Sequence, residues 1–188
     1  MIKTNEDERR DFFRIDDEVF IEIQAISEEE YNSAPETLQN LDDDSFSLSA
    51  NFAILNNKIN PVLNNIKQLH PDIGEYLEVI NNKIDSLSQH ILYENSDYDE
   101  QKLVHVNLSA SGIQLESQQN LNVGQTLKLE LVLLPEKIGV IIFGRVVEMK
   151  ESTLTIRFEH LRPEDQELMI KHNLNKQMSE LREKNDND

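Results

Sequence analysis

The sequence predicts an α+β protein: six short antiparallel strands form a small barrel, which is interrupted after its first strand by two long helices and followed by a C-terminal helix. Three patterns predict this architecture. Apolar residues alternate with polar ones in the second half of the chain, recur every seven residues between about 46 and 93, and recur at helical spacing after residue 163. The chain has 188 residues, of which 38% are hydrophobic, so it can form one sizeable core with an elaboration.

The first strand is predicted over residues 19–26, where the run Val19–Ile23 is rich in β-branched and aromatic residues. Two acidic runs follow it, Glu28–Glu30 and Asp42–Asp44. Runs of like charge rarely belong to a core, so we expect this stretch to form a solvated connection.

The next stretch has helical periodicity, with apolar residues at two positions of a seven-residue repeat. One series is Phe52, Ile59, Ile66, Ile73, Ile80 and Leu87; the other is Leu55, Val62, Leu69 and Tyr76; Ile84 and Ile91 widen the stripe. Pro71 lacks a backbone donor and crowds the preceding turn, which predicts two helices over about 46–69 and 72–93. Because the repeat continues through this break, one kinked helix is the alternative.

The apolar positions of this repeat are also the predicted oligomerisation surface. Two helices could bury them by packing on the barrel, but the stripe holds many large aliphatic residues for only two helices. Isoleucine at successive core positions of a heptad favours bundles of more than two strands. We therefore expect a homo-oligomer, with a tetramer favoured. Residues 45–94 would form the assembly element, while 1–44 and 95–188 would form the barrel domain.

The remaining strands follow from short alternating runs separated by turn residues. They are expected over residues 102–107, 112–117, 127–134, 140–149 and 154–158. With the first strand they make six, which suits a small closed or partly open barrel. Pro163 begins a good first helical turn, and the helix after it has one apolar face, formed by Ile170, Leu174, Met178 and Leu181.

Two short motifs far apart in the chain carry the candidate chemistry. Arg10 and Arg14 form R-x-x-x-R, and residues four apart lie nearly on one side of either a helix or a strand. A guanidinium group is always charged and fits phosphate oxygens or the O6/N7 edge of guanine. The second motif, N-x-S-x-x-G, contains Asn107, Ser109 and Gly112, which offer an amide, a hydroxyl and close backbone approach or a positive φ.

In this order, and with these strands around them, the two motifs resemble the ligand-binding signature of PilZ domains. These are bacterial receptors for cyclic di-GMP, built as six-stranded antiparallel barrels. The long gap between the motifs resembles the helix-bearing subset of the family that self-associates through such an insertion. The residues that the resemblance assigns to the ligand are Arg10, Arg14, Asn107, Ser109 and Gly112, with Arg9 as an auxiliary contact.

We therefore expect a non-enzymatic cyclic di-GMP receptor that oligomerises through its helical insertion. Whether it would bind one ligand or an intercalated dimer is left open. The alternative is an oligomeric PilZ-like adaptor for a motility or type IV pilus partner, without nucleotide binding. Arg145 is a weaker ligand candidate, interpreted first as an outward-facing strand charge.

Composition and motifs limit the other classes of function. The net charge of −18 argues against general affinity for nucleic acid or anionic membrane. The absence of cysteine and of an apolar leader or membrane-spanning run suggests a cytoplasmic protein. The five histidines have no metal-ligand spacing, and Ser109 is not in a G-x-S-x-G elbow, so we expect no metal, no cofactor and no enzyme.

Overall fold

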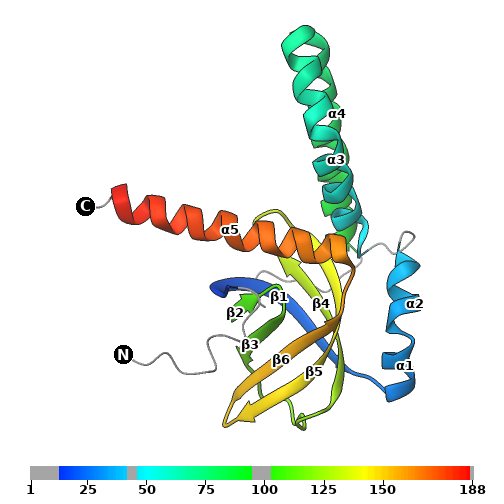
Figure 1. Ribbon diagram of the computed structural model, residues 1–188, viewed down its shortest axis with the longest axis vertical. Helices are drawn as coiled ribbons and strands as arrows, with labels where there is room; N and C mark the ends of the chain where they lie inside the picture. The colour runs from blue at the N-terminus through cyan, green and yellow to red at the C-terminus, as the bar shows by residue number, and fades with distance from the viewer. Residues whose placement is uncertain (1–12, 42–45, 95–102, 187–188) are drawn as a thin grey trace.

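A computed structural model describes residues 13–41, 46–94 and 103–186, and its centre is a closed, six-stranded antiparallel barrel (Figure 1). The strands are β1 (Ile15–Ala25), β2 (Val104–Ser109), β3 (Gly112–Glu116), β4 (Thr126–Leu133), β5 (Ile138–Lys150) and β6 (Thr153–His160). They close in the order β1-β2-β3-β6-β5-β4. The predicted fold class, with its insertion and its C-terminal helix, is confirmed.

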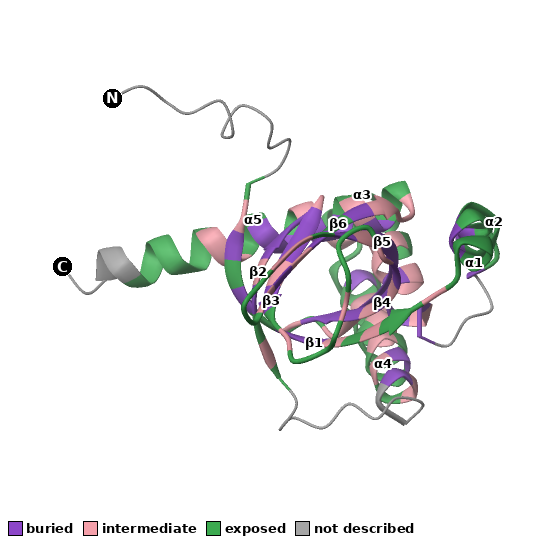
Figure 2. Cartoon of the chain, turned by 90° about the horizontal axis from the view of Figure 1, so that it is seen from below, coloured by how far each residue is buried: buried purple, intermediate pink, exposed green. Residues whose placement is uncertain are grey.

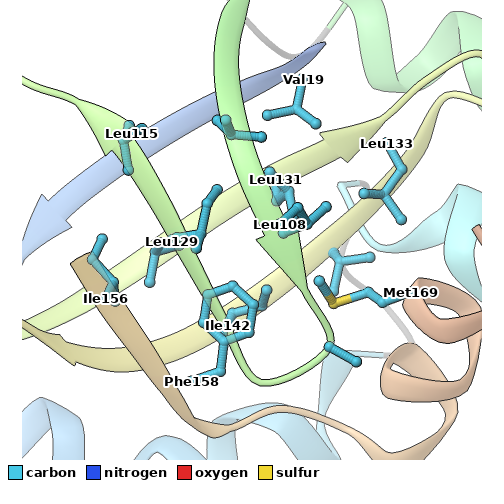
Figure 3. Packing of buried hydrophobic residues seen from close by; sticks show 14 of the residues in the cluster. Val19, Leu108, Leu115, Leu129, Leu131, Leu133, Ile142, Ile156, Phe158 and Met169 are labelled. Carbon is cyan, nitrogen blue, oxygen red and sulfur yellow. The ribbon is translucent and has the colours of Figure 1, made fainter. Parts of the chain in front are cut away.

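The barrel interior is filled by the apolar residues that alternate along each strand. Leu127, Leu129, Leu131 and Leu133 of β4 are all fully buried, as the alternation in the sequence predicted. They pack against inward residues of the other strands (Figure 3). Buried residues thus line the barrel, whereas the outer part of the C-terminal helix is exposed (Figure 2).

Strand β1 begins at Ile15, four residues before its predicted start at 19. Its first part, Ile15–Val19, pairs with β2, and its second part pairs with β4. The sequence did not predict a strand at residues 15–18 because Asp17 is acidic, and acidic residues are rare in strands and rarer in a core. Here Asp17 is buried, since side chains of the C-terminal helix neutralise it.

The connection after β1 is solvated at Glu28–Glu30, as expected, but it is helical: residues 28–39 form α1 (Glu28–Asn32) and α2 (Ala34–Gln39), with Tyr31, Ala34 and Leu38 buried. Ser27 caps α1 in a capping box: its hydroxyl accepts from the backbone N–H of Glu30, whose carboxylate accepts from the backbone N–H of Ser27. The acidic run is therefore a first helical turn. Asp42–Asp44 lie outside the described residues.

These helices cover outward-facing barrel residues and create a second apolar core. Its buried members are Phe20, Tyr31, Ala34, Leu38, Leu41, Phe46, Leu92, Val132, Ile141 and Phe143. Phe20 follows Val19, which points into the barrel, so neighbouring residues of β1 contribute to the two different cores. Apolar residues on both faces of β1, β4 and β5 are explained by this covering layer.

The insertion is an antiparallel hairpin of α3 (Leu48–Leu69) and α4 (Pro71–Glu94) that projects from the barrel (Figure 1). The two predicted helices are confirmed, and the single kinked helix is not formed. Asn56 donates two hydrogen bonds to the Asp85 carboxylate at 2.9 and 3.0 Å, and Lys67 pairs with Glu78 at 2.5 Å. These contacts join the start of α3 to the end of α4 and the end of α3 to the start of α4, as a hairpin requires.

The hairpin leaves much of the predicted stripe uncovered within one chain. Phe52, Ile66, Ile80 and Ile91 are partly buried. Large apolar side chains with 40–67% of their surface exposed are Leu55, Ile59, Val62, Leu69, Ile73, Tyr76, Val79, Ile84 and Leu87. Only the base of the hairpin is embedded, because Phe46, Ala50 and Leu92 are buried.

Helix α5 (Pro163–Asp186) lies across one end of the barrel (Figure 1). The face with which it packs on the barrel differs from the predicted apolar face. Its buried residues include Leu168, Met169 and His172, whereas Leu174, Met178 and Leu181 are about half exposed. Of the predicted apolar face, only Ile170 packs against the barrel core. Periodicity alone missed the packed face because that face includes buried polar side chains, His172 and Asn173.

Candidate functional site

The fold brings the described half of the first motif against the second. Because β1 and β2 are antiparallel with Asp16 opposite Asn107, Arg14 lies beside the end of β2. The Nη1 atom of Arg14 donates to Oδ1 of Asn107 at 3.2 Å and to its backbone carbonyl at 3.3 Å, while the amide nitrogen of Asn107 donates to Asp16 at 2.8 Å. Asn107 thus links an arginine to a carboxylate. Arg9 and Arg10 lie outside the described residues.

Ser109 is fully buried and shapes the turn between β2 and β3. Its hydroxyl donates to the backbone carbonyl of Gly112 at 3.1 Å and lies 3.3 Å from the backbone nitrogen of Ser111, from which it accepts. A hydroxyl between a carbonyl and an N–H fixes the path of such a turn. In this conformation Ser109 is a buried residue that holds the backbone of the turn in place.

The sequence left two reasons open for a glycine at position 112, a positive φ or close packing. Gly112 does not have a positive φ, so close packing is the reason. A Cβ atom at Gly112 would lie 2.7 Å from the carbonyl oxygen of Ile156 on β6. The same point lies 3.5 Å from Nη2 of Arg14. The absent side chain therefore lets β6 approach and keeps a small space next to the arginine.

Replacing Gly112 by alanine should lower the free energy of unfolding by about 1–3 kcal/mol, because the new methyl group would push apart β3 and β6. Chemical denaturation measures this change. Glu116→Ala, at an exposed position on the same strand, is the control and should have an effect below about 0.5 kcal/mol. Equal stability of the wild type and the Gly112→Ala variant would contradict the close-packing explanation.

The structure adds Arg157, which sequence reasoning did not select. Arg157 on β6 stands opposite Gly112 in the register, and its side chain is 62% exposed. It pairs with Glu159, whose Oε1 atom lies 2.6 Å from Nη2 of Arg157. Alternation in Leu154–Phe158 indicated an outward side chain at 157, but the pairing of β3 with β6 could not be read from the sequence.

Arg145 is an outward-facing strand charge that fastens α1 to the barrel. It bonds Glu28 at 3.1 Å and the carbonyl of Gly124 at 2.8 Å, and its guanidinium lies 4.9 Å from the centre of the Tyr31 ring. Burial and the hydrogen bond to Glu159 raise the pKa of Tyr31 to about 12, so its hydroxyl remains a donor at neutral pH.

A groove beside Asn107 is markedly acidic. Its lining includes Asp16, Glu18 and Glu116 as well as His105 and Lys176. Among the described residues, no cluster of three or more His, Asp or Glu side chains is arranged to hold a metal ion. Nor does any helix in the described ranges combine the length and apolar character needed to cross a membrane.

Comparisons with known proteins agree with this architecture. Residues 87–174 match the PilZ domain family, and this match includes β2–β6 and the N-x-S-x-x-G turn. PilZ domains are generally non-enzymatic receptor domains associated with cyclic di-GMP. No curated protein matches the sequence.

Two solved structures are similar to this chain at 13% sequence identity. One is a pathogenic protein from Xanthomonas campestris, described as a tetrameric PilZ domain self-assembled via an unusual helical bundle; the match covers 91% of this chain and 89% of that one, with a TM-score of 0.57. The other is the inhibitor of motility from Bacillus subtilis, with coverages of 91% and 52% and a TM-score of 0.42. The family model thus matches the part of the chain that contains β2–β6, and the closed six-stranded barrel has a PilZ-like fold.

Proposed function

We propose that this protein is a non-enzymatic cyclic di-GMP receptor that assembles through its α3–α4 hairpin. The observation that carries the proposal is the meeting of Arg14 with the turn of Asn107, Ser109 and Gly112, although the motifs are separated by the whole hairpin. A guanidinium beside a side-chain-free position can reach a ligand that lies on the strand backbone.

The chemistry of these groups suits a guanine-containing phosphodiester. The Arg14 fork can donate to phosphate oxygens or to O6 and N7 of guanine, and the Asn107 amide has both a donor and an acceptor. Binding would exchange the hydrogen bonds between Arg14 and Asn107 for bonds to the ligand. Arg9 and Arg10, just before Arg14 in the sequence, are proposed as further contacts.

Calorimetric titration of the full chain with cyclic di-GMP tests this proposal. We expect binding by the wild type and a loss of affinity of at least about 100-fold in Arg10→Ala/Arg14→Ala, because hydrogen bonds to charged groups contribute about 1.5–3 kcal/mol each. Arg182→Ala, on the exposed outer part of α5, is the control and should bind normally. Unchanged affinity in the double variant would reject the site.

Self-association is supported by the apolar side chains exposed on the hairpin. Monomeric proteins seldom expose large contiguous apolar patches, whereas both α3 and α4 present exposed residues along their length, from Leu55 to Leu87. A helical bundle formed with other copies of the chain would cover them. We propose a homo-oligomer, with a tetramer favoured, in which residues 45–94 are the assembly element.

A second candidate function is an oligomeric adaptor for a motility or pilus partner, without nucleotide sensing. The acidic groove favours it, because Asp16, Glu18 and Glu116 would repel an anionic ligand beside Asn107. This candidate predicts no heat of binding with cyclic di-GMP while assembly persists. Location in the cytoplasm stays a prediction in either case.

A further inference from the structure

Arg14, just before β1, and Arg157 of β6 both lie next to the side-chain-free point above Gly112. Nη2 of Arg14 is 3.5 Å and Cα of Arg157 is 3.6 Å from the position where a Cβ of Gly112 would be. Arg157 is on the outward face of β6, between the buried residues Ile156 and Phe158, and is largely exposed. Its long side chain can therefore turn toward a ligand over Gly112 without any change in the strand.

We propose that Arg157 is a further ligand-binding residue of this site, acting from β6 opposite Arg14. This inference rests on the proposed nucleotide-binding function. A phosphodiester or guanine edge over Gly112 would be held from one side by Arg14 and from the other by Arg157. Two guanidinium forks that converge on one anion bind it more tightly than either fork alone.

Glu159 is the competitor that holds Arg157 when no ligand is present. Nη2 and Nε of Arg157 both donate to Oε1 of Glu159, at 2.6 and 3.2 Å. Such an exposed ion pair contributes only about 0–1 kcal/mol, so a phosphate can displace the carboxylate at low cost.

The release of Arg157 would not leave Glu159 unpaired. Its other oxygen, Oε2, accepts a hydrogen bond from the hydroxyl of Tyr31 and lies 3.5 Å from Nε of Arg145. Both partners belong to the cluster that fastens α1 to the barrel. Glu159 therefore stays neutralised in either position of Arg157, which makes the exchange local.

Titration with cyclic di-GMP of four full-length proteins tests the inference: the wild type, Arg157→Gln, Glu159→Gln and the double variant. We expect about a 10-fold loss of affinity in Arg157→Gln, because a charge-assisted contact is removed. Glu159→Gln should bind roughly 2- to 5-fold more tightly, because the competing ion pair is gone. If Glu159 acts through Arg157, this gain disappears when the two changes are combined.

Arg182→Gln is the matched control, since it removes the same charge from an exposed helix position far along the chain. Thermal unfolding checks that all variants remain folded. If the wild type binds and Arg157→Gln binds equally well, the role of Arg157 is wrong while the proposed function stands. If Glu159→Gln keeps its gain without Arg157, the competitor role is wrong. A wild type that does not bind at all would overturn the proposed function and the inference together.

Discussion

Replacing Leu55 and Val62 by glutamate should convert the assembled protein into single chains. Both side chains are more than half exposed on α3, at 53% and 59%, so they contribute little to the fold of one chain but would be central to a bundle. A carboxylate buried there would have to lose its hydration at a cost of several kcal/mol, which weakens association at least about 100-fold. Glutamate also favours helix more than valine does, so α3 should persist.

Light scattering measures this change directly. The wild type should have a multiple of the 21.8 kDa chain mass, with four chains favoured, and the variant should have the mass of one chain. Asn60→Glu/Asn64→Glu adds the same two charges at exposed polar positions of α3 and should assemble normally. A wild type that is a single chain, or a double variant of unchanged mass, would reject assembly through the hairpin.

These substitutions test assembly more cleanly than removal of the whole insertion. Phe46, just before α3, and Leu92, near the end of α4, both lie at the base of the hairpin. They belong to the second apolar core together with Phe20 of β1. Deleting residues 46–93 would open that core and expose the outer face of the barrel. A monomer obtained in that way would not separate lost assembly from lost folding.

His172→Gln should lower the free energy of unfolding by about 2–3 kcal/mol at pH 6, and by much less at pH 9.5. His172 of α5 is buried, and its Nε2 lies 2.7 Å from the Asp17 carboxylate and its Nδ1 lies 3.4 Å from that of Glu136. Burial alone would lower the pKa of His172, but hydrogen bonds to Asp17 and Glu136 outweigh it and raise the pKa to about 9.

The sign of the pH dependence follows from these shifts. The pKa of His172 rises from 6.5 on folding, so its stabilisation is complete below pH 6.5 and is lost as the pH rises through about 9. Burial would raise the pKa of Asp17, but His172 and Lys176 together hold it below 3.8, so its stabilisation is complete above that value and is lost in acid. The cluster is therefore most stabilising between about pH 4 and 6.5.

Denaturant unfolding of both proteins at pH 6 and 9.5 measures the effect. His105→Gln is the control, because the His105 side chain is 86% exposed and lies 3.2 Å from the exposed carboxylate of Glu18. It should change the free energy of unfolding by less than about 0.5 kcal/mol at either pH. If His172→Gln lowers the free energy of unfolding by the same amount at both pH values, the charge of His172 does not stabilise the fold.

The same cluster explains why part of the site could not be read from the sequence. Asp17 is three residues after Arg14, and the bonds from α5 to Asp17 hold the beginning of β1 against β2. In the sequence Asp17 is one of several acidic residues, separated from its partners by more than a hundred positions. The strand start, the packed face of α5 and the placement of Arg14 all depend on that distant pairing.

Local sequence patterns were enough to predict an element where its conformation depends mainly on neighbouring residues in the sequence. Alternation gave the strands around Leu127–Leu133, and the seven-residue repeat with Pro71 gave two helices in the right places. The capping box at Ser27 is also visible in the sequence as S-x-x-E, but its glutamate belongs to an acidic run, which is typical of a solvated connection.

The sequence by itself determined the six strands, the helical insertion and the two motifs, because periodicity and motif spacing are properties of the chain. Only the tertiary structure decided which strands are neighbours. That arrangement brings Arg14 to Asn107, makes Gly112 the point where β6 must approach, and places the Cα atom of Arg157 beside the same point. The physical reason is that barrel closure pairs strands through hydrogen bonds between distant segments, whose register is set by the packing of the core as a whole.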